Sequence, residues 1–122
     1  SMTLVESRGR KAVFLKEIVR ILSLSDTEVV SARCEAVAWS QGREGTADAV
    51  TVRAVRLNSS LVNSIGRLLR PGGSLLLFGS KLTSLPSETA TPKFTLQGHH
   101  RLLPSSEDRL AVFRRDRDLP VG

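Results

Sequence analysis

Four polar side chains follow apolar stretches that end abruptly, which is where a parallel sheet places its ligand contacts. Glu6 follows Thr3-Leu4-Val5, the pair Cys34-Glu35 follows the next strand-like stretch, and Arg53 follows Val50-Thr51-Val52. Ligands of open α/β sheets bind outside the carboxyl ends of the strands. A carboxylate there can accept hydrogen bonds from hydroxyl groups, and a guanidinium can hold a carboxylate or phosphate with two parallel hydrogen bonds.

A second group of candidates is basic. The chain carries a net charge of +6 and has a sequence pI near 10.7. No acidic residue occurs between Asp48 and Glu88, and five basic residues fall in that interval. A phosphate-facing surface that binds RNA is one interpretation, and an ordinary solvated basic face is the other. The RNA-binding candidates are Arg53, Arg56, Arg67, Arg70 and Lys81.

Several kinds of chemistry find no support in the sequence. Cys34 is the one cysteine of the chain, so neither an internal disulfide nor a four-thiolate zinc site can form. His99 and His100 are adjacent and point apart, so we expect no metal site. We found no phosphate-binding glycine loop of the P-loop type and no catalytic triad. No apolar run approaches the roughly 20 residues of a membrane span, and we expect a cytoplasmic protein without a signal peptide.

The elements that would position these residues alternate between strands and helices. The stretch LLRPGGSLLLFGS, residues 68–80, predicts a helix that stops at Pro-Gly-Gly and a strand buried on both faces. An earlier helix shows an apolar stripe made by Phe14, Ile18, Ile21 and Leu22. Residues 80–92 read as a loop, and His99 and His100 fall in a second loop between the last two strands. Strands are predicted at 3–6, 28–32, 48–52, 74–78, 93–97 and 110–114.

The order of the predicted strands and helices along the chain predicts the fold class. Alternating strands and helices favour an α/β domain with a mostly parallel, Rossmann-like sheet, helices on both faces and an antiparallel edge hairpin. We expect the first four strands to be parallel and the last to be antiparallel to its neighbour. The predicted domain covers residues 3–115, and residues 116–122 form a flexible tail.

The ordered set of segments resembles one family of S-adenosylmethionine-dependent methyltransferases. TLVESRGRKAVFLKEIVRILSLSDTEVVSARCEAV resembles the second strand, helix and third strand of the glucose-inhibited division protein B family, which methylates guanine N7 in small-subunit ribosomal RNA. ADAVTVRAV is similar to its fourth strand, LLRPGGSLLLFGSK to the junction before the fifth strand, and EDRLAVFRR to a closing edge strand.

The resemblance implies a cofactor, a partner and site residues. The cofactor is S-adenosyl-L-methionine and the partner is ribosomal RNA. Glu6 would accept hydrogen bonds from the ribose hydroxyls, and Cys34 and Glu35 would meet the adenine. Arg53 would lie near the methyl donor and the target base. All four are therefore expected cofactor-binding residues, and the resemblance leaves the catalytic residues unassigned.

The chain departs from the family in one feature that bears on its expected activity, the glycine-rich loop. The family begins with a strand and a glycine-rich loop that holds the methionine part of the cofactor, and this chain contains no G-x-G pattern. The absent strand would lie between the strands of Glu6 and Val50, leaving two unpaired edges and Phe14, Ile18 or Leu61 partly bare. We therefore expect a truncated methyltransferase-like protein that is inactive alone.

Two alternative functions stay open on the sequence. One is a non-catalytic module that binds RNA or protein through the basic surface. The other is one half of a split methyltransferase, completed by a second chain that supplies the missing strand. Because unpaired strand edges are templates for pairing, we also expect a homo-oligomer or a complex with such a second chain.

Overall fold

The computed structural model describes residues 1–53, 57–79, 94–101 and 109–117. Its strands and helices alternate over the first two thirds of the chain, as predicted, and two strands follow. In chain order the elements are β1 (Met2–Val5), α1 (Gly9–Ile21), β2 (Thr27–Val30), α2 (Cys34–Ala38), β3 (Ala47–Arg53), α3 (Ser59–Leu68), β4 (Leu69–Gly79), β5 (Phe94–Arg101) and β6 (Arg109–Arg115).

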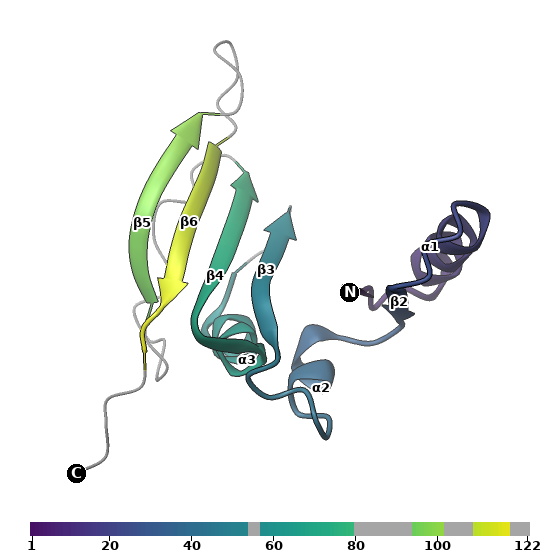
Figure 1. Ribbon diagram of the computed structural model, residues 1–122, viewed down its shortest axis with the longest axis horizontal. Coiled ribbons are helices and arrows are strands. Elements are labelled where there is room, and N and C mark those ends of the chain that lie inside the picture. The colour runs from purple at the N-terminus through teal and green to yellow at the C-terminus, as the bar shows by residue number, and fades with distance from the viewer. Residues whose placement is uncertain (54–56, 80–93, 102–108, 118–122) are drawn as a thin grey trace.

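The strands form two separate sheets (Figure 1). β1 and β2 are parallel, and β3 and β4 are parallel within a sheet of order β3-β4-β6-β5. β6 is antiparallel to both β4 and β5, which confirms the edge hairpin. The α/β class is confirmed, and no ladder joins β1 to β3 in the described part of the chain, as the absence of the intervening strand led us to expect.

The main core lies between α3 and the larger sheet. Asn58 caps α3 as its side chain accepts a hydrogen bond of 2.8 Å from the Leu61 backbone N–H. Leu75 and Leu77 are fully buried, whereas Leu76 and Phe78 on the other face of β4 are only half-buried, so the prediction of two buried faces was wrong. The buried cluster consists of Leu61, Ile65, Leu69, Leu75, Leu77, Ala111 and Phe113.

The Pro-Gly-Gly motif lies inside β4 rather than between a helix and a strand. α3 ends at Leu68, and Leu69 and Arg70 already belong to β4. Arg70 precedes a proline, which disfavours the helical conformation and ends the helix earlier than its apolar spacing suggested. Gly72 has a φ of +81°, and the β3–β4 register shifts between Ala47 and Ala49. The motif therefore makes an irregular start to a long strand.

The helix of the smaller sheet leaves much of its apolar surface uncovered. Ala12 is the one buried residue of α1, and Phe14 is 63% exposed. Ile21 and Leu22 are exposed too, while Ile18 is half-buried. The expectation of bare apolar side chains is therefore confirmed for α1 and was wrong for Leu61, which the core buries.

The carboxyl-terminal strands bring one correction. His99 and His100 belong to β5 and pair with Ala111 and Leu110 of β6, so they do not lie in a loop. The Thr95 hydroxyl donates a hydrogen bond of 2.6 Å to Asp116 just beyond β6. The predicted loop at 80–92 and the end of the predicted tail, 118–122, lie outside the described residues. Among the helices described here, none is long and apolar enough to cross a membrane.

Candidate functional site

Glu6 continues the β1–β2 ladder at its carboxyl end. Its backbone N–H donates to the Val30 carbonyl at 3.0 Å, and its own carbonyl accepts from the Ala32 N–H at 3.1 Å. The side chain is half-buried, and Oε1 accepts a hydrogen bond of 3.0 Å from the Arg8 backbone N–H. That contact fixes one carboxylate oxygen at the edge where a parallel sheet receives ligands.

Cys34 and Glu35 open α2, four and five residues after the end of β2. Cys34 is half-buried and packs against the main core, and burial raises the pKa of its thiol to about 11 with a smaller contribution from Glu35. The thiol is therefore neutral at physiological pH and offers a small apolar surface, not a nucleophile. Because Ala32 is bonded to Glu6, this segment and Glu6 leave the same edge of the smaller sheet.

Arg53 ends β3 and is exposed, in register with Phe78 of β4. It lies at the carboxyl end of the larger sheet, whereas the other candidate cofactor residues lie at the carboxyl end of the smaller one. The structure thus divides the predicted cofactor site between the two sheets.

Arg67 and Arg70 lie at the opposite end of the larger sheet from Arg53. Arg67 is the next-to-last residue of α3, and Arg70 is the second residue of β4 and contacts Asp48. The Arg70 Nε donates to Asp48 Oδ1 at 2.9 Å, so part of its charge is neutralised. Arg56 and Lys81 lie outside the described residues. The described basic candidates therefore do not form one continuous surface with Arg53.

Arg67 also has a structural role that the sequence did not reveal. Its guanidinium lies 4.0 Å from the centre of the Trp39 ring, and its Nε donates to the Ala38 carbonyl at 2.9 Å. Nη1 lies 3.3 Å from Glu44 Oε1. These contacts hold the end of α2 against α3. Their partners are 23 or more residues away along the chain, so no local pattern could have indicated them.

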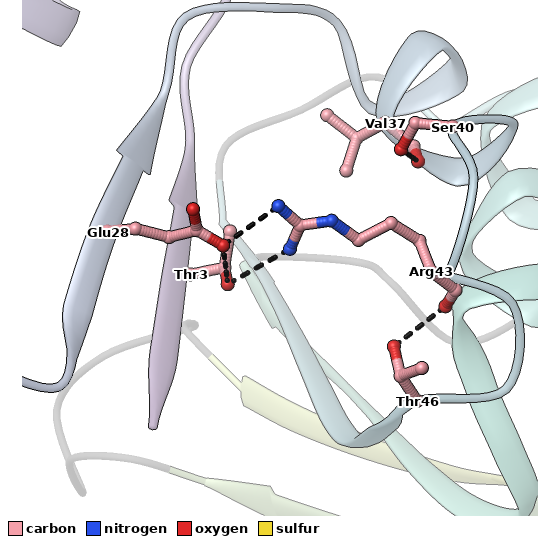
Figure 2. Close-up of polar contacts among 6 residues, drawn as sticks. All are labelled: Thr3, Glu28, Val37, Ser40, Arg43 and Thr46. Carbon is pink, nitrogen blue, oxygen red and sulfur yellow. Dashed lines mark hydrogen bonds and ion pairs between the residues drawn. The ribbon is translucent and has the colours of Figure 1, made fainter.

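Arg43 is the second residue that the sequence analysis missed. Figure 2 shows its guanidinium extending from the loop before β3 to Thr3 of β1 and Glu28 of β2. Nη2 lies 2.8 Å from Glu28 Oε1, and Nη1 lies 3.4 Å from Thr3 Oγ1. The Thr46 hydroxyl donates to the Arg43 carbonyl at 2.7 Å and steadies the loop. Arg43 therefore links the amino ends of both sheets, away from the ends that carry Glu6 and Arg53.

A family model described as rRNA small subunit methyltransferase G (GidB) matches residues 1–108. The chain belongs to this family. Over 75 residues it is 44% identical to the ribosomal RNA small subunit methyltransferase G of Xanthomonas campestris and to that of Stenotrophomonas maltophilia. Each match covers 62% of this chain and 34% of the relative, so the matched region spans about a third of the relative's length.

Solved structures show the same fold. The methyltransferase yhhF from Escherichia coli matches 95% of this chain with a TM-score of 0.73 at 14% identity, and 64% of that protein is covered. An rRNA methylase from Clostridium thermocellum matches 95% of this chain with a TM-score of 0.68 at 11% identity, with 73% of it covered. Because these matches include both sheets, the two sheets together have the methyltransferase arrangement, and the recognised fold and family are confirmed.

The family and the fold support S-adenosylmethionine as the cofactor by resemblance. A structural neighbour, a mutant of MtNAS, was solved in complex with S-adenosylmethionine, with a TM-score of 0.64 and 14% identity over 93% of this chain. The residues present in this chain fit the adenosine half of S-adenosylmethionine. A half-buried carboxylate at Glu6 suits ribose hydroxyls, and the apolar Cys34 suits an aromatic ring. In the described part of the chain, no glycine-rich loop follows a strand to hold the methionine half.

Proposed function

We propose that this chain supplies the adenosine side of the S-adenosylmethionine site, and a base-side arginine, of a small-subunit rRNA guanine-N7 methyltransferase in the cytoplasm. We further propose that the 122-residue chain does not transfer methyl groups by itself. The proposal rests on the family match, on the positions of Glu6 and Arg53 at strand ends and of Cys34 at the start of α2, and on the division of the sheet.

Each residue would act by positioning. Glu6 would accept hydrogen bonds from the two ribose hydroxyls, and Cys34 and Glu35 would border the adenine. Arg53 would hold a carboxylate or an RNA phosphate with its planar guanidinium. The bound cofactor would supply an electrophilic methyl group, and the lone pair of guanine N7 is already a nucleophile. The protein's contribution would therefore be the relative placement of the two reactants.

One observation carries the proposal that the isolated chain is inactive. β1, which leads to Glu6, and β3, which leads to Arg53, share no ladder and no intervening strand among the described residues. Misplacement of reacting groups by about 1 Å can cost about 100-fold in rate. Two sheets that are linked mainly through loop and helix contacts do not hold Glu6 and Arg53 in place with that precision.

Isothermal calorimetry of S-adenosylmethionine with this chain tests the proposal, together with transfer of a labelled methyl group to small-subunit rRNA. We expect weak or no binding and no transfer. Low-micromolar affinity with transfer would contradict the proposed inactivity. If binding is detected, Glu6→Ala should weaken it, whereas Glu17→Ala, which removes an exposed acid of α1, should leave it unchanged. Equal affinity of both variants would contradict the role of Glu6.

A further inference from the structure

Four arginine side chains surround the irregular start of β4, at the end of the larger sheet opposite Arg53. Antiparallel pairing brings the end of β6 to this point, with Arg114 in register with Ser74 (Figure 1). All four side chains lie against the first five residues of β4, Leu69–Gly73, or bond to them. We call this group the arginine cluster; its members are Arg70, Arg114, Arg115 and Arg117.

Two members of the arginine cluster are held by the backbone of β4. The Arg115 Nη1 donates a hydrogen bond to the Leu69 carbonyl. The Arg70 Nη1 donates to the Pro71 carbonyl at 3.3 Å, while the Arg70 Nε pairs with Asp48. Both guanidiniums are therefore fixed beside the Pro-Gly-Gly motif, where they add positive charge to the surroundings of the other two.

Gly72 leaves the space between the other two guanidiniums open. Its φ of +81° lies in the left-handed region that favours glycine. A Cβ at this position would lie 3.5 Å from the Arg117 Nη2 and 3.7 Å from the Arg114 Nη2. Both nitrogens are thus close to one point in front of the backbone. Phosphate oxygens accept from guanidinium nitrogens at about 2.7–2.9 Å, so a single phosphate can bridge the two side chains.

The two guanidiniums beside Gly72 are not neutralised by the protein. In the ranges that the structure describes, neither Arg114 nor Arg117 forms an ion pair with a carboxylate, and both residues are exposed. Asp116 lies between them in the sequence but accepts a hydrogen bond from the Thr95 hydroxyl. Like charges at this separation repel each other. A bound anion would remove that repulsion, so the pair is arranged to receive one.

We propose that Arg114 and Arg117 clamp one phosphate group of an RNA backbone in front of Gly72. RNA carries a negative charge on every nucleotide, which suits a chain whose net charge is +6. Phosphate contacts fix the position of a nucleic acid and do not read its sequence, so the clamp would orient the RNA from the end of the sheet opposite Arg53. That the anion is RNA rests on the proposed function, whereas the clamp rests on the geometry.

Fluorescence anisotropy of a labelled oligouridylate with the whole chain tests the clamp. Arg114→Ala and Arg117→Ala should each weaken binding at least about tenfold, because each removes a hydrogen bond to a charged group. Arg117→Lys keeps the charge but loses the planar fork, so its affinity should be intermediate. Arg20→Ala is the matched control: it removes one positive charge from the exposed surface of α1 and should change the affinity less than about twofold.

The salt dependence of binding distinguishes one shared phosphate from two separate contacts. For single strands, each neutralised phosphate contributes about 0.7 to the slope of log K against log salt concentration. If both arginines hold the same phosphate, the double variant Arg114→Ala with Arg117→Ala should reduce the slope by about 0.7. A reduction of about 1.4 would indicate two independent phosphates and would overturn the clamp.

Three further results would overturn the proposal. The first is no binding of oligouridylate by the unaltered chain, and the second is equal affinity of the Arg114, Arg117 and Arg20 variants. The third is equally tight binding of a polyglutamate peptide with the same sensitivity to these variants, which would assign the arginine cluster to an acidic protein segment. Neither S-adenosylmethionine nor methyl transfer enters the measurement, so the clamp and the proposed function can each fail while the other stands.

Discussion

The Arg43 guanidinium, in the loop that leads into β3, and the Glu28 carboxylate of β2 lie 2.8 Å apart and form an ion pair that ties this loop to the smaller sheet. Thr3 completes the contact by donating its hydroxyl hydrogen to Glu28 Oε1 at 3.1 Å. The link lies at the amino ends of the strands, so it holds the sheets together there while their carboxyl ends carry the candidate cofactor residues.

Removing the link should loosen the smaller sheet. In Arg43→Ala, we expect amide exchange in β1 and β2 to become several-fold faster, with exchange in β4 unchanged. Arg43→Lys keeps the charge but cannot contact Glu28 and Thr3 with two nitrogens, so its effect should be intermediate. Amide exchange followed by NMR distinguishes these outcomes. Equal acceleration in β4 would show that Arg43 supports the whole fold instead.

Acid should weaken the same link. The hydrogen bond from Arg43, followed by that from Thr3, lowers the pKa of Glu28 below its ordinary value of 4.5. The unfolded chain therefore takes up the proton first, and the stabilisation is complete above pH 4.5 and is lost as the pH falls through the folded pKa. Glu28→Gln should remove this part of the acid sensitivity of β1–β2 exchange. Glu17→Gln, which breaks a pair within α1, should not.

Gly73 should not tolerate a side chain. A Cβ at this buried position would lie 2.9 Å from the Arg70 carbonyl oxygen and 3.1 Å from that of Asp48. Both neighbours are backbone atoms, so Gly73→Ala should lower the free energy of unfolding by about 1–3 kcal/mol. Gly9→Ala is the matched control, because nothing lies within 4 Å of its Cβ and alanine favours the helix. Urea unfolding of the two variants compares them directly, and equal stability would contradict the close approach.

Arg67 should contribute more than Arg70 to the free energy of unfolding. Arg67→Ala removes the stacking on Trp39 and the bond to the Ala38 carbonyl, at a cost of about 1–2 kcal/mol. Arg70→Ala removes an exposed pair with Asp48 and should cost less than about 0.5 kcal/mol. The chain has one tryptophan, so its fluorescence should change in the first variant only. The reverse order of stabilities would contradict the structural role of Arg67.

Cys34 should react slowly with thiol reagents in the folded chain. Burial raises the pKa of the thiol to about 11, so the reactive thiolate is scarce at pH 8. We expect the modification rate to rise at least about tenfold in urea. A native rate equal to the unfolded one would show that the thiol is not held against the core.

The sequence predicted the elements well because their signals are local. Short apolar runs bounded by turn residues located the six strands of the described residues, and Asn58 marked the start of α3. Arg70 was placed in the helix, since apolar spacing continued through Leu69, but the following proline outweighed that spacing. His99 and His100 were assigned to a loop because polar residues weaken a strand pattern, although β6 supplies pairing partners for them.

The candidate site was predictable only in part. Strand ends could be read from the sequence for Glu6 and Arg53, whereas Cys34 begins α2 four residues after the end of β2. The functional roles of all three residues remain predictions. The contacts of Arg43 with Glu28 and of Arg67 with Trp39 depend on side chains far apart in the chain. A loop arginine beside glycines gives no local sign of a partner on another sheet.

The central claim, that β1 and β3 each keep an open edge, is tested most directly by residue-resolved amide exchange of the isolated chain at low concentration. Parallel strands direct alternate amides to opposite sides. In β3 we therefore predict slow exchange at the residues that donate to β4 and fast exchange at the residues between them. β1 should show the same alternation relative to β2. Slow exchange at every residue of both strands would contradict the account, because it would mean that the two edges are already paired.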